Sequence, residues 1–228
     1  MDKIPFSIYD FFGYLTPGAL FLISIDYFLL KQQLIKSAAE NLITGFVSLI
    51  LVYIIGHIIS SVSCWCFEKI FVKKFLKPPS VTLFKDKRSI VKLKKLFSTY
   101  YNPLSKNVQD NIIKKLGIES ETSEDEKYNA MFQLAFSRVK IHEPSMLSLN
   151  NFLYLYGFAR SVSLVCLVMV LILFVSSVFY KISICPWWIV GFIFAFIMMF
   201  FRYLKFYRYY DRDMFLSYLS LPEKEAGK

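Results

Sequence analysis

Residues 42–67 read LITGFVSLILVYIIGHIISSVSCWCF, a run without a single Asp, Glu, Lys or Arg. At a rise of about 1.5 Å per residue, a helix over this run is long enough to cross a hydrocarbon core roughly 30 Å thick. Three further apolar stretches, 11–30, 161–180 and 186–201, reach or approach the same length. Because the four stretches stand two and two around a polar block, the pattern predicts two pairs of transmembrane helices.

The composition of the chain leads to the same class. Of its 228 residues, 56% are hydrophobic and 18% aromatic, and the mean hydropathy of +0.46 lies outside the range of soluble globular proteins. We therefore predict an all-α integral membrane protein with four transmembrane helices and a small helical cytoplasmic domain inserted between helices 2 and 3. The expected parts are an N-terminal transmembrane hairpin (1–67), the basic cytoplasmic domain (68–158), a C-terminal transmembrane hairpin (159–201) and an amphipathic, basic and aromatic tail (202–228).

The distribution of Lys and Arg predicts the orientation in the membrane. Lys31 and Lys36 lie between the first two apolar stretches, and Lys181 lies between the last two. Most of the other Lys and Arg side chains belong to the polar block or follow residue 201. Since cytoplasmic segments carry an excess of these cations, both termini and the block are expected to face the cytoplasm.

Basic side chains near the cytoplasmic ends of the spans are candidates for binding anionic lipid headgroups or a protein partner. The four that follow residue 201, Arg202, Lys205, Arg208 and Arg212, recur at spacings of three and four. This spacing predicts one face of a helix that continues beyond the last span. Arg160, at the start of the third span, is expected to bind a lipid phosphate or to pair with Asp10 or Glu68. Nucleic acid is the alternative ligand, but a neighbouring membrane favours lipid. The candidates are Lys73, Lys74, Lys77, Arg88, Arg160, Arg202, Lys205, Arg208 and Arg212.

The first pair of spans carries polar and helix-breaking residues. Pro17 has no backbone N–H, so a kink is expected beside Gly18. Counted from each membrane face, Pro17 and Gly18 fall at a similar depth to Gly56 and His57, slightly to the cytoplasmic side of the middle. We therefore expect His57 or Ser61 to lie close to the kink. An ionisable group inside a membrane suggests a functional site, while a histidine that only fixes helix packing is the favoured alternative.

Small residues recur along the second span at helical spacing. Gly56 and Ser60 are followed by Ser63 or Cys64, which predicts a stripe suited to close helix contact. Self-association of the chain would bury this stripe, so a homo-oligomer is expected.

Other features of the sequence argue little for chemistry. Cys64 and Cys66 form a single Cys-x-Cys pair, which is favoured as helix packing over a metal site. Arg138 and His142 are one residue closer than the Arg-x4–6-His spacing of HEPN-type ribonucleases, and Pro144 follows them. We predict no catalytic residue, metal site or cofactor.

Three stretches of the chain carry a resemblance to known proteins: YDFFGYLTPGALFL (9–22), YIIGHIISS (53–61) and YGFARSVSL (156–164). Together they resemble bacterial four-pass inner-membrane proteins encoded in phage-defence loci. The membrane subunit of Kiwa-type defence systems is similar in size and number of spans. The resemblance covers the membrane half only, and it implies an oligomer of the bacterial inner membrane that senses or alters membrane state together with a cytosolic protein.

These observations leave three expectations for function. The first is a non-enzymatic inner-membrane component of antiviral defence, which couples a membrane event to a cytosolic partner. The alternative is an oligomeric pore that depolarises the membrane, lined by polar residues of the first two spans such as Thr16, Ser24, Asp26 and His57. A membrane-bound enzyme or nuclease is the third, and it requires titrating groups that converge in one pocket.

Overall fold

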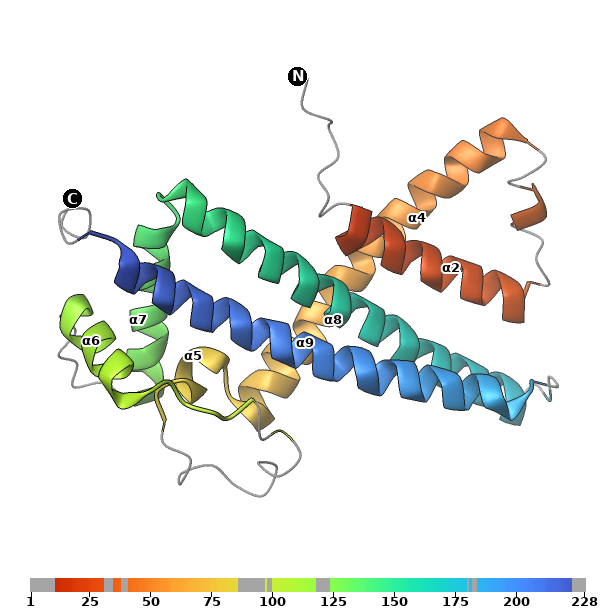
Figure 1. Ribbon diagram of the computed structural model, residues 1–228. Helices are drawn as coiled ribbons and strands as arrows, with labels where there is room; N and C mark the ends of the chain where they lie inside the picture. Colours follow the sequence, from red (N-terminus) through yellow and green to blue (C-terminus); the bar gives the residue numbers. More distant parts are fainter. Residues whose placement is uncertain are drawn as a thin grey trace. The chain divides into compact units, whose positions relative to one another are not determined.

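The computed structural model describes residues 11–30, 35–37, 41–85, 97, 100–117, 124–179, 181 and 184–222. Within these residues the fold is helical and contains no strand (Figure 1). The elements are η1 (Phe11–Leu15), α2 (Thr16–Phe28), α4 (Leu42–Ser63), η2 (Cys64–Leu76), α5 (Pro79–Thr82), α6 (Lys106–Leu116), α7 (Glu124–Val139), α8 (Glu143–Val178) and α9 (Pro186–Ser220), of which η1 and η2 are π-helices. The expectation of an all-α protein is therefore confirmed for the described residues.

Among the described residues, three helical stretches are long and apolar enough to cross a membrane: Leu42–Thr82, Glu143–Val178 and Pro186–Ser220. They include the second and fourth of the expected spans, and the third up to Val178. The first expected span, 11–30, is helical from Phe11 to Phe28 but is not among the three. The chain thus has the helices of a multi-pass membrane protein.

The chain divides into two compact units. Unit 1 comprises 1–70 and 154–203, and unit 2 comprises 71–153 and 204–228. Helices α8 and α9 each contribute residues to both units. The sequence treated 202–228 as a separate tail, whereas α9 extends unbroken to Ser220 and its last turns belong to the core of unit 2. The expected helical continuation beyond residue 201 is confirmed.

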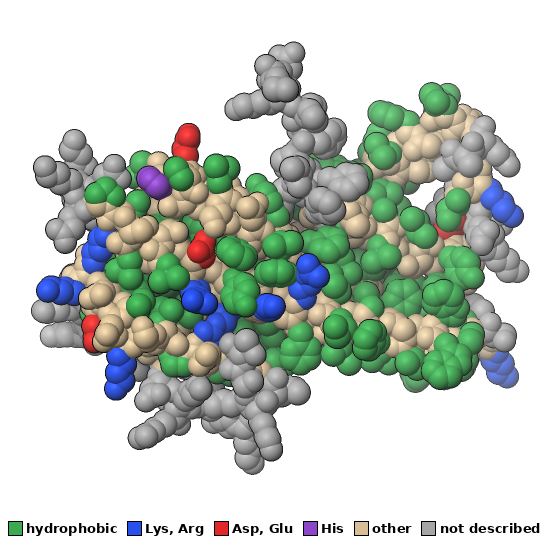
Figure 2. Space-filling model, in the orientation of Figure 1, with side chains coloured by type: hydrophobic (Ala, Val, Ile, Leu, Met, Phe, Trp, Pro, Cys, Tyr) green, Lys and Arg blue, Asp and Glu red, His purple; other side chains and the backbone are tan. Residues whose placement is uncertain are grey.

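The surface of unit 1 is rich in exposed apolar side chains. On α4, Leu42, Ile43 and Phe46 are 64–90% exposed, and on α9 the side chains of Trp187 and Phe194 are 78% and 65% exposed. Figure 2 shows hydrophobic side chains covering the visible face of the first half of α9. Such a continuous apolar surface is suited to lipid and not to water.

Unit 2 has a hydrophobic core of its own. It is built from α5, α6, α7, the start of α8 and the end of α9, and aromatic rings lie at its centre: Phe84 stacks on Tyr128 and meets Phe215 edge-on at 5.0 Å. The buried core residues are Leu83, Phe84, Ile112, Leu116, Met131, Ala135, Val139, Leu149, Met214, Phe215, Tyr218 and Leu221. A folded module with this much buried apolar surface is more than a linker between spans.

The ends of the helices in unit 2 follow local sequence signals. α6 ends at Gly117, whose φ of 63° is the left-handed conformation that glycine adopts without steric cost. α8 begins at Glu143, and Pro144 falls in its first turn, in which a missing N–H breaks no helical bond. The side chain of Ser148, one turn further on, donates to Asp213 of α9.

A buried tyrosine holds the turn that follows η2. The hydroxyl of Tyr101 donates to the carbonyl oxygen of Leu76 over 2.9 Å. Burial raises the pKa of Tyr101, so the group remains a protonated donor at neutral pH. The turn itself passes through Lys77, whose φ is 65° and whose N–H donates to Val72.

Lys115 of α6 closes the C-terminal end of α9. Its ammonium donates to the carbonyl oxygens of Tyr218, Leu219 and Leu221 over 3.2, 2.9 and 2.5 Å. These carbonyls lie where a helix has no intrahelical donors left and where its dipole favours a cation.

Lys115→Met is expected to loosen this end of α9 locally. Loss of charged hydrogen bonds of this kind costs roughly 1.5–3 kcal/mol, and partial solvent exposure of Lys115 places the effect at the lower end. Hydrogen–deuterium exchange of a peptide that covers 215–221 should become several-fold faster. The neighbouring Lys114 is exposed, and Lys114→Met serves as the control with unchanged exchange. Equal exchange in both variants would show that Lys115 does not cap the helix.

Candidate functional site

The first two helices of unit 1 cross with their backbones in contact. A Cβ atom added to Gly18 of α2 would lie 2.0 Å from the carbonyl oxygen of Val52, and one added to Gly56 of α4 would lie 1.9 Å from that of Tyr14. Real Cβ atoms do not approach backbone so closely. Glycine is therefore required on both sides of this crossing, and the two residues are those that the sequence placed at similar depth.

His57 lies beside the crossing. Its ring stacks on Tyr14 at 3.7 Å between centroids and meets Tyr53 edge-on at 4.6 Å. Tyr14 belongs to the π-helical turn that ends immediately before α2, in whose first turn Pro17 lies. His57 is thus close to the irregular part of the first helix, as expected. Ser61 is exposed and donates to the carbonyl of His57 within its own helix, so it takes no part in the crossing.

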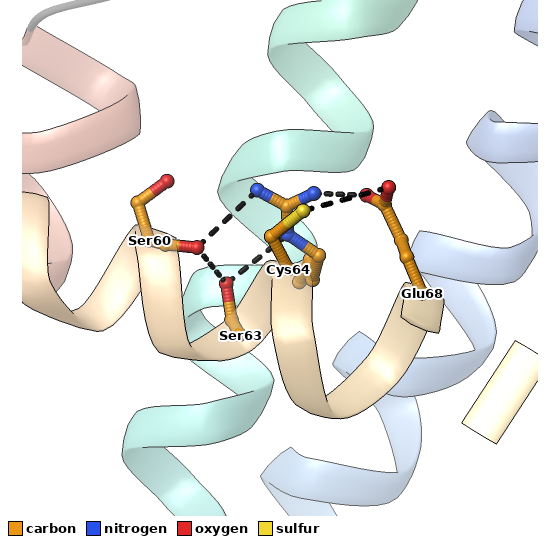
Figure 3. Close-up of polar contacts among 5 residues, drawn as sticks. Ser60, Ser63, Cys64 and Glu68 are labelled. Atoms are coloured by element: carbon orange, nitrogen blue, oxygen red, sulfur yellow. Dashed lines mark hydrogen bonds and ion pairs between the residues drawn. The ribbon is translucent and has the colours of Figure 1, made fainter. Parts of the chain in front are cut away.

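The most polar cluster inside unit 1 surrounds Arg160 (Figure 3). The Arg160 side chain extends from α8, is only 8% exposed and forms an ion pair with Glu68 of η2. Its Nε donates to Ser63 Oγ over 3.1 Å, and its second terminal nitrogen reaches the carbonyl oxygen of Ser60 at 3.5 Å. The guanidinium also lies 5.8 Å from the ring centroid of Tyr156. Of the two expected roles of Arg160, the structure shows the pair with Glu68.

Small side chains on α4 make room for the guanidinium. Ser63 is fully buried and donates to the carbonyl oxygen of Ser60 over 2.8 Å, while its own oxygen accepts from Arg160. Cys64 is half-buried and its thiol lies 3.7 Å from the second carboxylate oxygen of Glu68. The change from α-helix to π-helix at Cys64 falls inside this cluster. π-Helical turns next to α-helices are frequently found at functional sites.

The small-residue stripe is therefore occupied within one chain. Gly56 packs on the backbone of Tyr14, and Ser60 with Ser63 receives Arg160. The sequence left Ser63 and Cys64 open as the third member, and Ser63 is the more buried of the two. Because these positions are already covered, the stripe no longer argues for self-association. The sequence could not show this, since it does not say which helix covers a stripe.

The predicted headgroup-binding cations differ in their exposure. Lys73 and Lys74 of η2, and Arg202, Lys205 and Arg212 of α9, are exposed. Lys77 lies in the turn after η2 and is partly buried, with its carbonyl oxygen accepting from Tyr100. Arg88 lies outside the described residues.

Arg208 differs from the other cations of α9. It is 7% exposed and donates to the carbonyl oxygens of Tyr100 and Asn102, the first over 2.6 Å. The structure thus separates Arg208 from the exposed cations with which the sequence grouped it, because the segment around Tyr100 covers this part of the helix. Arg208 holds unit 2 together and is not placed to meet a lipid headgroup.

The residues that the sequence offered for nuclease or metal chemistry are not assembled into a site among the described residues. His142 Nδ1 lies 2.9 Å from Ser145 Oγ at the start of α8, while Arg138 is a partly buried residue of α7. Within the described residues no three His, Cys, Asp or Glu side chains come close enough together to hold a metal ion. The arrangement around Arg160 can fix helices against one another.

Comparison of the chain with protein-family models, curated proteins and solved structures found no match. The fold alone therefore defines the class: a multi-pass helical membrane protein with a second helical unit.

Proposed function

We propose that this chain is a non-enzymatic component of the bacterial inner membrane that couples a membrane event to a cytosolic protein partner in antiviral defence. The observation that supports coupling most directly is the path of α8 and α9, each of which contributes residues to the apolar unit 1 and to unit 2. A movement of either helix in the bilayer is therefore passed to unit 2 through the continuous helix backbone. The link to antiviral defence rests on the three stretches of family resemblance.

The proposed topology has four spans, with η1 and α2 forming the first, and both termini in the cytoplasm. Unit 2 then lies on the cytoplasmic side, with its exposed cations toward anionic headgroups or the partner. Support comes from the exposed cations of α9 that follow the last apolar stretch: Arg202, which ends it, and Lys205 and Arg212 of unit 2. A chain that assembles as a homo-oligomer fits the same proposal.

Cys185 offers a test of this topology. It is exposed in the turn between α8 and α9, whereas Cys64 and Cys66 are partly buried at the opposite end of their span. A membrane-impermeant maleimide is expected to label Cys185 in intact spheroplasts, and Cys185→Ser is expected to abolish that labelling. Labelling of Cys185 only after permeabilisation would reverse the proposed orientation.

Coupling is favoured over a pore by the state of the polar groups in the first two spans. Ser24 Oγ donates to Leu20 of its own helix, and Ser61 Oγ does the same to His57. Asp26 is 1% exposed and accepts from the backbone N–H of Ile35. These groups are engaged locally, as polar groups surrounded by lipid and protein need to be.

The function is tested by expressing the chain with its neighbouring genes in a phage-sensitive bacterium and measuring plating efficiency. Replacing Arg202, Lys205 and Arg212 by Gln is expected to lower protection while membrane insertion stays normal. Lys36→Gln with Lys181→Gln, on the opposite side, serves as the control. Unchanged plating after removal of the whole gene would contradict the proposal, and depolarisation of uninfected cells by the chain alone would favour the pore.

A further inference from the structure

Unit 1 contains an apolar crevice of about 270 Å³ between α2, α4 and α8. Its lining side chains are all apolar and include Phe21, Ile58, Val62, Leu164 and Val168. Sites for cofactors and metabolites usually measure roughly 300–1,000 Å³ and contain a few polar groups that orient the ligand. A smaller crevice with purely apolar walls instead suits a slender hydrocarbon chain.

The crevice opens on the outside of the unit. Its floor is formed by buried residues of α8, with Leu164 at 7% and Val165 at 1% exposure. Its rim is formed by α4, where Ile58 is 57% and Val62 is 42% exposed. Since this surface faces lipid when the three long helices span a bilayer, an occupant enters from the hydrocarbon region.

An aromatic residue and a cation follow the rim along the chain, toward the end of the span. Trp65 and Lys69 come after the rim residue Val62, in the π-helix η2 that begins at Cys64. Trp65 is 57% exposed, and Lys69 is exposed. Tryptophan and lysine at the end of a span are the side chains that contact the headgroup region and attract anionic lipid.

We propose that this crevice binds one acyl chain of an anionic phospholipid, with the lipid phosphate against Lys69 and the glycerol region beside Trp65. A helix of a second copy is the competing occupant. Close helix contact needs small residues, but among the described residues no Gly, Ala or Ser lines the crevice, and Gly56 and Ser60 of the α4 stripe are already buried within the chain. The proposal goes beyond the proposed function, because it requires only that unit 1 lies in a bilayer and not that the chain acts in defence.

Native mass spectrometry of the purified full chain tests the proposal. The protein is titrated in detergent with phosphatidylglycerol and with phosphatidylcholine of identical acyl chains. For the first lipid molecule that binds, the affinity for phosphatidylglycerol is expected to exceed that for phosphatidylcholine about fivefold. This is the size of effect that one lysine near a membrane surface produces. Lys69→Gln is expected to remove the preference while both lipids still bind, and Lys181→Gln, at an exposed cation elsewhere in the unit, is expected to retain it.

Two valines of α8 provide matched tests of the crevice itself. Val168→Phe fills the crevice and is expected to weaken binding of both lipids about tenfold. Val178→Phe makes the same enlargement at a 53% exposed position outside the crevice and is expected to change nothing. Ile58→Ala removes part of the rim without adding bulk, so it should weaken binding even if Val168→Phe does not fold.

Three outcomes would overturn the proposal. Equal lipid binding by Val168→Phe, Ile58→Ala and Val178→Phe would identify the bound lipids as a non-specific shell. An equal loss of preference in Lys69→Gln and Lys181→Gln would show a general effect of charge. A change of oligomeric mass in Val168→Phe with lipid binding retained would assign the crevice to a second copy of the chain.

Discussion

Gly56→Ala is expected to destabilise the chain by at least roughly 3 kcal/mol, which is the upper end of the usual cost of overpacking. The added Cβ would lie 1.9 Å from the carbonyl oxygen of Tyr14 and 2.5 Å from its carbonyl carbon. Both atoms belong to a helical backbone, so neither can rotate away as the end of a side chain would. The two helices must separate, and the stacking of His57 on Tyr14 is then lost as well.

A glycine on another helix provides the control. A Cβ at Gly191 of α9 would meet no atom within 4 Å, so Gly191→Ala is expected to be neutral or to stabilise by up to about 1 kcal/mol through helix propensity. Gly18→Ala should behave like Gly56→Ala, since its Cβ would lie 2.0 Å from the Val52 carbonyl oxygen. Thermal unfolding of the purified full-length variants measures the difference. Closely similar melting of Gly56→Ala and Gly191→Ala would contradict a crossing through backbone contact.

The position of this crossing is the part of the candidate site that sequence reasoning located. The length of an apolar run fixes where it enters and leaves a membrane, so residues on two neighbouring runs can be compared in depth by counting. This count placed Gly18 and Gly56 at a similar depth, and in the structure the two glycines lie at the crossing with His57 beside them. The continuation of α9 to Ser220 was likewise predictable, because helical periodicity persists after the apolar run ends.

Contacts between residues far apart in the chain were not predictable in the same way. Helical spacing placed Arg208 on one face with Arg202 and Arg212, but it carried no sign that the backbone around Tyr100, more than one hundred residues earlier, covers Arg208. Spacing also left Ser63 and Cys64 open as the third member of the stripe, and it carried no sign of the change from α-helix to π-helix at Cys64. Local patterns assume a constant period and cannot show where it changes.

Glu68→Leu is expected to destabilise the chain by about 3 kcal/mol, because it leaves the Arg160 guanidinium buried without its carboxylate partner. Breaking a buried ion pair by removing one partner typically costs roughly 3–5 kcal/mol, and the 22% exposure of the Glu68 side chain places this pair at the lower end. Hydrogen bonds from Arg160 to Ser63 and to the Ser60 carbonyl persist but do not neutralise the charge. Asp110→Asn, at an exposed acidic residue of α6, is the control and is expected to change stability by less than about 0.5 kcal/mol.

The double variant Arg160→Met/Glu68→Leu separates the two possible reasons for keeping this pair. Apolar side chains of similar volume often replace a buried ion pair at little cost, so the double variant should recover most of the stability that Glu68→Leu loses. If it does, the pair orients η2 and α8 and adds little net stability, and the affected property should be the helix arrangement near Cys64. If the double variant were as unstable as Glu68→Leu, the hydrogen bonds from Arg160 to Ser63 and to the Ser60 carbonyl would themselves stabilise the packing of α4 on α8. Similar melting of Glu68→Leu and Asp110→Asn would contradict a buried pair altogether.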